Sequence, residues 1–364
     1  MGIDLRDRIQ RYQMWLKRAP VDRPLIGLIW EPDIPPLPEF LEMMGDGVVL
    51  SPDQIEPGLF LPYLDAWHQR DSEWTSDVIQ SYSPAFGIPW VEAMAGCPLI
   101  TAPGSIWAEP FLDTLHERSS IRFDPMDPWL RKLVEFTQAM VKHASGRFPV
   151  ALPQMRGPLD TLAAMRTPER MCEDLIESPD EVDRILGELT DLWIGIAQTI
   201  LDVIPPFHGG YCTRMNMWAP GRAITPQNDV STLVSPIMYE DLALPYDRKI
   251  MQEFPFHCFH MHSTEHHQVE VFLKIEELTA FELTLEHTLG GPPLEVVIPK
   301  VLRILEEKPL MLCALDFNTA DWCIQNLPHE GLCLTIGVFD QNPDKEYDHW
   351  LERQCTVGVS DIRG

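Results

Sequence analysis

The sequence has few basic residues and lacks any long apolar run. Its 28 Lys and Arg residues face 55 Asp and Glu residues, which gives a formal net charge of -27. Such an excess of negative charge repels nucleic-acid phosphates and anionic membrane surfaces, so neither is expected as a partner. No stretch approaches the roughly 20 apolar residues that span a bilayer, and the first residues lack the apolar core of a signal peptide. We therefore expect a cytoplasmic protein.

The signatures of several common enzyme classes are also missing. No GxGxxG follows the first predicted strand and no GxxxxGK[ST] occurs, so the nucleotide-binding folds find no support. No GxSxG is present, which removes the usual mark of a serine hydrolase. The eight cysteines are scattered without a CxxC pair. In a reducing compartment we expect them to be free thiols rather than a disulfide framework.

Short apolar runs alternate with segments of helical periodicity along the chain. Helices are predicted where apolar residues recur with the helical period, at 4–18, 128–145, 179–203, 236–254, 265–277, 293–307 and 319–327. Strands are predicted at the apolar runs 25–30, 148–152, 207–211, 256–262, 279–285, 310–315 and 332–338, with an eighth within 76–110. This alternation is typical of an α/β fold with a parallel sheet. The strand count favours a TIM-type (β/α)8 barrel, forming a single domain over residues 1–364.

Proline is a structure-breaking residue that the sequence has in abundance. Its 34 prolines are densest over residues 20–62. Proline fixes its own backbone angle and lacks the amide donor that regular ladders need. We therefore expect a long ordered loop in this Pro-rich N-terminal region, and we interpret residues 32–125 as an insertion or lid on the barrel.

In a parallel barrel, the side chains just beyond the carboxyl ends of the strands form the active site. This rule selects Glu31 and Glu286 as candidate general acids or bases. It also selects a set of candidate substrate-binding residues, namely Gln154, Arg214, Asn216 and Asp229. Asp229 equally suits a turn or a helix cap.

The strongest local motif is the run HCFHMH at residues 257–262. Side chains alternate across a strand, so Cys258, His260 and His262 share one face. Residues two apart lie about 7 Å from each other at Cα, which lets both imidazoles contact one metal ion. The alternative is a hydrogen-bonded histidine pair lining a polar mouth.

A third metal ligand would have to come from another strand. Glu286 follows the next strand, although it equally suits a capping or ion-paired carboxylate. Cys333 is the other candidate, although its place near the start of its strand also suits core packing.

Several segments, taken in order, resemble the uroporphyrinogen decarboxylase superfamily. They are RDRIQRYQMWLKRAPVDRPLIGL, RGPLDTLAAM, DLIESPDEVDRIL, DVSTLVSPIMYEDLALPYDRKI, FHMHST and GGPPLEVVIPKVLRILEEKPLML, which together span residues 4 to about 340. The resemblance implies a (β/α)8 barrel. It also implies one of two activities: porphyrinogen decarboxylation, or zinc-dependent methyl transfer between a corrinoid protein and a thiol.

The chain departs from both family patterns. The arginine-rich motif of the decarboxylase is replaced by IWEPDIPPLP, with no arginine until Arg70, which disfavours a substrate with many carboxylates. The methyltransferases bind zinc with an HxC pair and a cysteine of the last strand. His260 matches the histidine, His262 replaces the cysteine, and Cys333 falls near the last cysteine. Fewer thiolate ligands leave the metal more positive, so a bound thiol ionises more easily but attacks less readily.

The resemblance therefore favours a zinc-dependent, methyltransferase-like enzyme. His260 and His262 would hold the metal, with Glu286 or Cys333 completing the site. The methyl group would move between a corrinoid or a methylated small molecule and a thiol-type acceptor. No cobalamin-binding DxHxxG occurs, so a corrinoid would arrive on a partner protein.

Two other functions stay open at this stage. One is a metal-free decarboxylase or other lyase that uses Glu31, Glu286 or His262 as acid or base. The other is a non-catalytic barrel that binds a tetrapyrrole or a corrinoid-loaded partner, since a fold does not fix a function.

Overall fold

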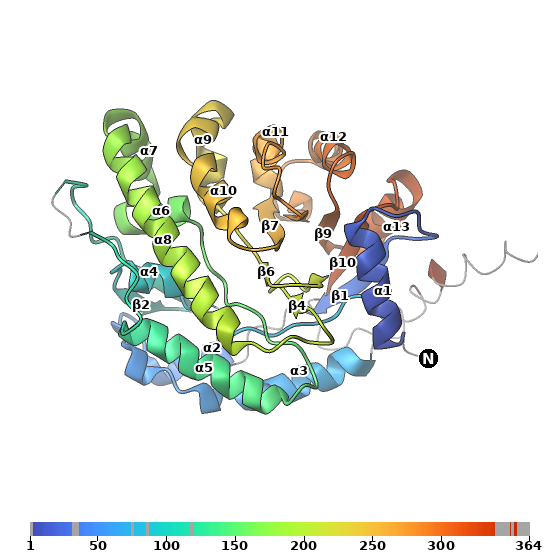
Figure 1. Cartoon of the computed structure of the whole chain (residues 1–364), viewed down its shortest axis with the longest axis horizontal. Helices are drawn as coiled ribbons and strands as arrows, with labels where there is room; N and C mark the ends of the chain where they lie inside the picture. The colour runs from blue at the N-terminus through green and yellow to red at the C-terminus, as the bar shows by residue number, and fades with distance from the viewer. Residues whose placement is uncertain are drawn as a thin grey trace, which may run out of the picture.

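The centre of the molecule is a sheet of six parallel strands. A computed structural model describes residues 3–30, 36–73, 76–84, 87–116, 120–338, 350 and 353–354. The strand order is β1-β10-β9-β8-β7-β6 (Figure 1). The strands are β1 (Leu25–Trp30), β6 (Ala223–Ile224), β7 (Phe256–His262), β8 (Ala280–Thr284), β9 (Leu310–Leu315) and β10 (Leu332–Val338). Two antiparallel hairpins stand outside this sheet: β2 (Leu99–Ala102) with β3 (Ser105–Ala108), and β4 (Tyr211–Cys212) with β5 (Trp218–Ala219).

Helices surround the sheet. In chain order they are α1 (Leu5–Leu16), α2 (Pro36–Met44), α3 (Leu61–Glu73), α4 (Trp90–Met94), α5 (Pro128–Ala144), α6 (Pro158–Arg166), α7 (Pro168–Glu177), α8 (Pro179–Val203), α9 (Pro236–Leu242), α10 (Leu244–Gln252), α11 (Val269–Phe272), α12 (Leu294–Leu305) and α13 (Phe317–Asn326). Short 3-10 turns are η1 (Pro52–Gln54), η2 (Pro57–Leu59), η3 (Asp229–Leu233), η4 (Ser263–Gln268) and η5 (His287–Leu289). Figure 1 shows α7, α9, α11 and α12 in a row along the upper edge, with α2, α3 and α5 along the lower edge.

The sequence patterns place most of these elements correctly. The predicted bounds of β1, β7, β9 and β10 are confirmed. The strand prediction at 148–152 is wrong, because that segment contributes one isolated bridge at Val150. The prediction at 207–211 is also wrong, since strand β6 lies further on, after the β4–β5 hairpin. Only two residues of β6 pair with β7, which leaves too short an apolar run for the pattern to detect.

Backbone segments continue beyond both edges of the sheet. Beside β1, the amide of Asp77 donates to the carbonyl of Ile26 over 2.9 Å, and Tyr82 then bridges Val150 in parallel. Beside β7, the amide of His260 donates to the carbonyl of Pro226 over 2.9 Å. These contacts fit a TIM-type fold, and closure into an eight-stranded barrel stays a prediction.

The Pro-rich region is more regular than a long loop. Pro36, Pro52 and Pro57 are the first residues of α2, η1 and η2, because a proline at the start of a helix loses no hydrogen bond. The expectation of a long ordered loop over 20–62 is therefore wrong where α2, η1 and η2 form. The role of residues 32–125 as a lid, and the single domain over 1–364, stay predictions.

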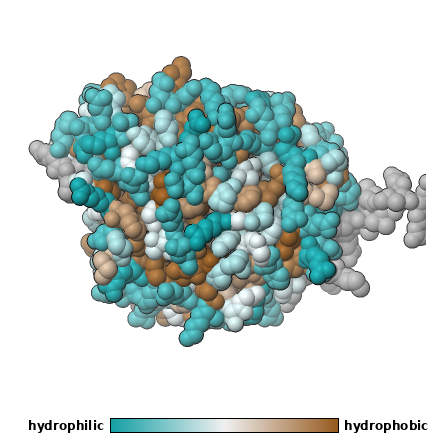
Figure 2. All heavy atoms as spheres, viewed as in Figure 1, coloured by the Kyte–Doolittle hydropathy of each residue, from teal (hydrophilic) through white to brown (hydrophobic). Residues whose placement is uncertain are grey.

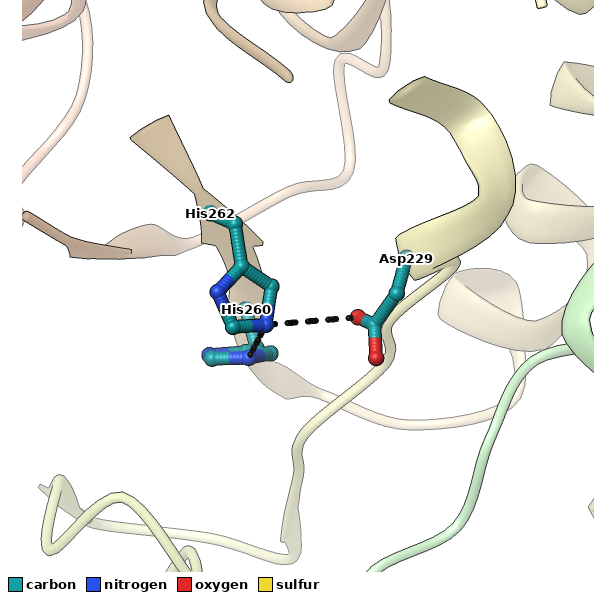
Figure 3. Close-up of side chains that lie close together, drawn as sticks. All are labelled: Asp229, His260 and His262. Carbon is teal, nitrogen blue, oxygen red and sulfur yellow. Dashed lines mark hydrogen bonds and ion pairs between the residues drawn. The ribbon is translucent and has the colours of Figure 1, made fainter. Parts of the chain in front are cut away.

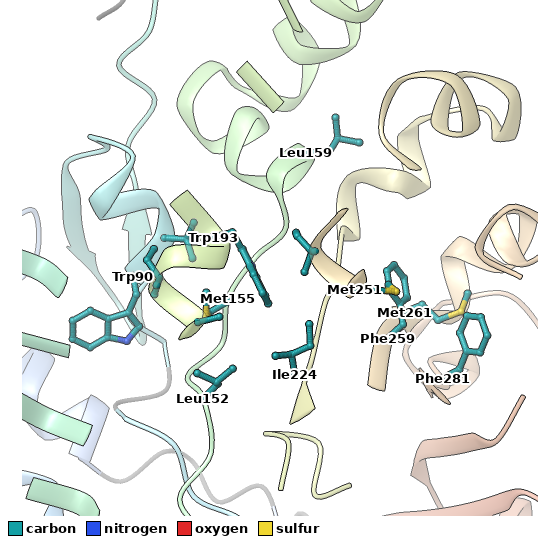
Figure 4. Packing of buried hydrophobic residues seen from close by; sticks show 14 of the residues in the cluster. Trp90, Leu152, Met155, Leu159, Trp193, Ile224, Met251, Phe259, Met261 and Phe281 are labelled. Atoms are coloured by element: carbon teal, nitrogen blue, oxygen red, sulfur yellow. The ribbon is translucent and has the colours of Figure 1, made fainter. Parts of the chain in front are cut away.

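Alternation along β7 separates two apolar clusters. Phe259 and Met261 join the large cluster beneath the helices, whose side chains extend past Ile224 of β6 toward Phe281 of β8 (Figure 4). Cys258 points to the other face and joins a smaller cluster. That cluster contains residues near the starts of the strands together with side chains of α1 and the β4–β5 hairpin, among them Tyr12, Leu25, Ala280, Met311, Cys333, Met217 and Trp218. Apolar side chains therefore pack against this face of the sheet at the amino ends of its strands.

The surface is mixed in character. Figure 2 shows a face covered largely by hydrophilic residues, with scattered apolar side chains between them. None of the helices in the described part of the chain combines the length and apolar character needed to cross a bilayer.

Candidate metal centre

His260 and His262 lie side by side at the carboxyl end of β7. Their ring centroids are 4.8 Å apart, and the two Nε2 atoms are 3.3 Å apart (Figure 3). His260 is buried, whereas the side chain of His262 is 31% exposed. The shared strand face predicted for the two rings is confirmed, and one of them can be reached from solvent.

A carboxylate holds the far nitrogen of each ring. The Nδ1 of His260 contacts the carboxylate of Glu282, and the Nδ1 of His262 lies 3.0 Å from Oε1 of Glu286. A carboxylate accepts hydrogen bonds, so each Nδ1 carries a proton, and in a neutral ring Nε2 then presents a lone pair. The strand register makes the first of these contacts possible, because His260 pairs directly with Glu282 across β7 and β8.

Two neutral imidazoles in these tautomers repel each other across 3.3 Å unless a cation lies between them. For two Zn–N bonds of about 2.05 Å at a tetrahedral angle, the nitrogens would be roughly 3.3 Å apart. The observed Nε2–Nε2 distance has this value. A proton shared between the two nitrogens is the other way to remove the repulsion.

Asp229 completes a group that could hold an ion. It is the first residue of η3, and its Oδ1 lies 4.0 Å from Nε2 of His262 (Figure 3). One ligand atom from each of Asp229, His260 and His262 lies within 4.8 Å of the others. Gln227 orients the carboxylate, since its Nε2 donates to Oδ1 over 3.2 Å and to Oδ2 over 3.0 Å.

The backbone of Asp229 is held by a buried carboxylate of α6. Asp160 accepts from the amide of Asp229 over 3.0 Å and from that of Val230 over 2.9 Å. Asn228 makes a second link, because its Oδ1 accepts from the amide of Leu159 over 3.2 Å while its Nδ2 donates to Asp247 over 2.7 Å. The start of α6 is therefore fastened to the turn that carries the third candidate ligand.

Glu265 ties the end of β7 to the same turn. It accepts from the amide of His262 over 2.7 Å and from the hydroxyl of Ser231. Burial, with the nearby charges of Asp229 and Asp160, raises the pKa of Glu265 well above its usual value. Burial and the charge of Asp229 likewise raise the pKa of Asp160. The site therefore concentrates carboxyl groups in a poorly solvated space, which favours a bound cation.

Glu282 titrates in the opposite direction. Burial alone would raise its pKa, but the charge and hydrogen bond of His260, with hydrogen bonds from Cys313 and Thr284, lower it below the usual value. Glu282 therefore remains an anion that can hold the His260 ring.

The other residues predicted to act in the metal site or in catalysis lie outside the group formed by Asp229, His260 and His262 or outside the described residues. Glu286 contacts His262 and accepts from Ser263 over 3.3 Å, so it lies behind the ring and outside the triad. Cys333 lies near the start of β10 in the smaller cluster, where burial raises the pKa of its thiol well above its usual value. Their roles as metal ligands stay predictions, as does the role of half-buried Gln154. Glu31 falls outside the described residues.

Two predicted substrate-binding residues lie at the amino ends of the strands. Arg214 and Asn216 belong to the β4–β5 hairpin, which packs with α1. The Oδ1 of Asn216 accepts from the amide of Ser81 over 2.8 Å and from its hydroxyl over 3.0 Å. Because residues 207–211 were predicted to be a strand, Arg214 and Asn216 were expected just beyond its carboxyl end, at the mouth of the barrel. The β4–β5 hairpin instead packs with residues near the starts of the strands.

Sequence reasoning missed Glu282, Asp160 and Glu265. One signal was available, because Glu282 is a charged residue inside the apolar run AFELT. A charge buried in a strand needs a partner, and the neighbouring HxH motif supplies one. Asp160 and Glu265 gave no such signal, since acidic residues near helix starts are common.

Comparisons with known proteins bear on the fold. No protein-family model and no curated protein sequence matches the chain. Among solved structures, a methyltransferase from Methanosarcina mazei is similar, with a TM-score of 0.61 and 13% sequence identity. The alignment covers 92% of this chain and 94% of that one. At this identity the likeness shows a shared fold.

Proposed function

We propose that the chain is a metal-dependent enzyme of the methyltransferase type, with His260, His262 and Asp229 as the metal ligands. The observation that carries the proposal is the pair of converging Nε2 atoms, 3.3 Å apart, whose rings are both fixed from behind by carboxylates. Carboxylate–histidine–metal arrangements of this kind set the tautomer and raise the basicity of the ligand.

Two histidines and one carboxylate are the ligand set of many catalytic zinc sites, which keep a further position open. The same set also suits iron(II). Zinc is the first candidate because the methyltransferases that the sequence resembles use zinc. When bound, the ion would act as a Lewis acid on a thiol-type acceptor. The exposed sides of His262 and Asp229, 31% and 35%, give an acceptor access to the open position.

The chain's own residues have defined tasks in this proposal. Glu282 and Glu286 accept from the Nδ1 side of each ring, so in the neutral rings both Nε2 atoms present lone pairs toward one point. Gln227 and Asp160 orient Asp229 toward the same point. Because the site carries no thiolate, the ion stays more positive than in an HxC site, which lowers the pKa of a bound thiol further.

The methyl donor would be a methylated small molecule or a corrinoid carried on a partner protein, and the fold likeness to a methyltransferase supports this class. The proposal also takes the six parallel strands and the two flanking segments as members of a closed (β/α)8 barrel.

A transfer assay tests the reaction class. Zinc-loaded protein would be incubated with methylcobalamin and a small thiol, and the methylated thiol would be measured by mass spectrometry. We expect product from the wild type, and none from the His260→Ala, His262→Ala double variant or after chelation. If the protein binds one zinc per chain but forms no methylated thiol, the proposed reaction class is contradicted and the proposed metal site still stands. A carbon-dioxide-releasing activity that is insensitive to chelators would support the metal-free lyase instead.

A further inference from the structure

An arginine close to the candidate metal centre forms no hydrogen bond with the described residues and a single ion pair. Arg156 follows the segment that bridges Tyr82 and precedes α6. Its NH1 is 3.4 Å from Oε1 of Glu92 in α4, and within the described part of the chain this is the ion pair that Arg156 forms. The Arg156 side chain is 44% exposed, whereas that of Glu92 is 2% exposed. One end of the pair is thus anchored in the interior, and the other faces solvent.

The chain path places Arg156 at the site. The next residue, Gly157, packs so closely on the turn before Asp229 that an added Cβ would lie 2.2 Å from the carbonyl oxygen of Gln227. One turn further on, Asp160 holds the amide of Asp229. Charge effects agree with this placement. The charge of Arg156 opposes the rise in the pKa of both Glu92 and Asp160 that burial causes.

The remaining donors of Arg156 suit an anion. A guanidinium presents five N–H donors in a planar fork, and a single ion pair at 3.4 Å occupies little of that capacity. The Oε1 atom of Glu92 also lacks a hydrogen bond within the described part of the chain, so the pair is held by charge rather than by a fixed geometry. The guanidinium can therefore turn toward a ligand without breaking a hydrogen bond to any residue that the structure describes.

We propose that Arg156 is a substrate-binding residue that takes a singly charged carboxylate group of a small molecule, with Glu92 limiting the positive charge of the subsite. Planar carboxylates match the guanidinium fork in a bidentate manner. A dianion such as phosphate fits less well, because Glu92, Asp160 and Asp229 all lie within electrostatic reach of the same place. The molecule's other end would point toward Asp229 and the two histidines.

The orientation of that molecule rests on the proposed metal function, whereas anion binding by Arg156 does not. The test therefore measures binding with and without zinc. Isothermal titration calorimetry would compare 3-mercaptopropionate with its uncharged amide, 3-mercaptopropionamide, on zinc-loaded and on metal-free protein. Wild-type protein should prefer the carboxylate by about tenfold, the worth of one charge-assisted contact.

Two variants are expected to change this preference in opposite directions. Arg156→Gln should abolish it, while Glu92→Gln should increase it, because a neutral amide leaves the guanidinium charge less compensated. A purely structural role for the pair would lower binding in both variants. Arg170→Gln is the matched control, since Arg170 forms a similar ion pair with Asp113 at 3.4 Å and is 50% exposed. That variant should retain the wild-type preference.

The outcomes separate the two proposals. A carboxylate preference that survives in Arg156→Gln, or that falls in Glu92→Gln, would overturn the inference. Inorganic phosphate that binds more tightly than 3-mercaptopropionate through Arg156 would overturn the singly charged ligand. If zinc does not bind but the metal-free protein keeps an Arg156-dependent preference, the inference stands and the metal function fails.

Discussion

The Nδ1 atom of His262 lies 3.0 Å from Oε1 of Glu286, and this contact fixes which nitrogen of the ring can bind an ion. Glu286 follows β8, so the carboxylate approaches the ring from behind and leaves Nε2 pointing at His260. Glu282 does the same for His260 from inside β8. Two neighbouring strands thus supply both the ligand atoms and the groups that orient them.

Removal of either supporting carboxylate should weaken metal binding without abolishing it. Glu282→Gln and Glu286→Gln each keep the side-chain shape but lose the anionic acceptor of a ring N–H. We expect a 10- to 100-fold loss of zinc affinity in each, as is usual for such supporting groups. Competition with a coloured chelator measures the change. Glu306→Gln, which alters an exposed ion pair with Arg303, should bind zinc as the wild type does.

The third ligand can be assigned by a pair of variants. Asp229→Asn keeps the hydrogen-bonding size of the side chain but removes its charge, so zinc affinity should fall at least as far as in the variants of Glu282 and Glu286. Cys333→Ala should leave the affinity unchanged, because Cys333 lies near the start of β10. The same titration checks both. Loss of zinc in Cys333→Ala with retention in Asp229→Asn would transfer the ligand role to the cysteine.

The close approach of Gly157 to the turn before Asp229 should be visible in stability. A Cβ at this position would lie 2.2 Å from the carbonyl oxygen of Gln227 and 2.3 Å from Oδ1 of Asn228. Gly157→Ala should therefore destabilise the protein by about 1–3 kcal/mol, the usual cost of overpacking. Gly187→Ala, in α8, meets nothing nearer than 3.7 Å and should stabilise the helix slightly. Urea unfolding of the two variants beside the wild type gives the comparison.

Asp247 should make stability fall as the pH rises. Burial raises its pKa to about 7, although hydrogen bonds from Tyr239 and Asn228 act in the opposite direction. The folded state then keeps a proton that the unfolded chain releases near pH 4, so this stabilising contribution is complete below about pH 4 and is lost as the pH passes 7. Between pH 5 and pH 8 the wild type should lose roughly 2–3 kcal/mol through this group.

The variant Asp247→Asn cannot titrate at this position and should lack that loss. Urea unfolding at pH 5 and pH 8 measures the difference. Exposed Asp241, in the preceding helix α9, offers the control, and Asp241→Asn should keep the wild-type pH dependence. Equal pH dependence in the wild type and Asp247→Asn would contradict the assignment.

Periodicity in the sequence was enough to predict most of the fold. Long helices such as α5 and α8 carry an uninterrupted apolar stripe, and β9 and β10 are apolar runs whose residues are mostly buried. The prediction failed where pairing is short. Strand β6 has two residues in register with β7, and its neighbours are loops whose course depends on tertiary contacts.

The site was predictable only to the extent that it is local. The HxH spacing alone places His260 and His262 on one face of their strand. The partners Glu282 and Glu286 depend on the register between β7 and β8, which the sequence does not state. Asp229 depends on the path of the chain after β6 and on its link to Asp160, a contact across 69 positions. Long-range contacts of this kind leave no periodic trace.

Metal analysis of the purified protein tests the central claim most directly. After reconstitution with zinc and removal of excess ion, the wild type should retain about one equivalent per chain. The His260→Ala, His262→Ala double variant should retain none, and its far-ultraviolet circular dichroism spectrum should match that of the wild type, which shows that it is folded. A wild type that binds no divalent ion, or a double variant that binds as much as the wild type, would mean that the two histidines share a proton and that no metal centre exists at the end of β7.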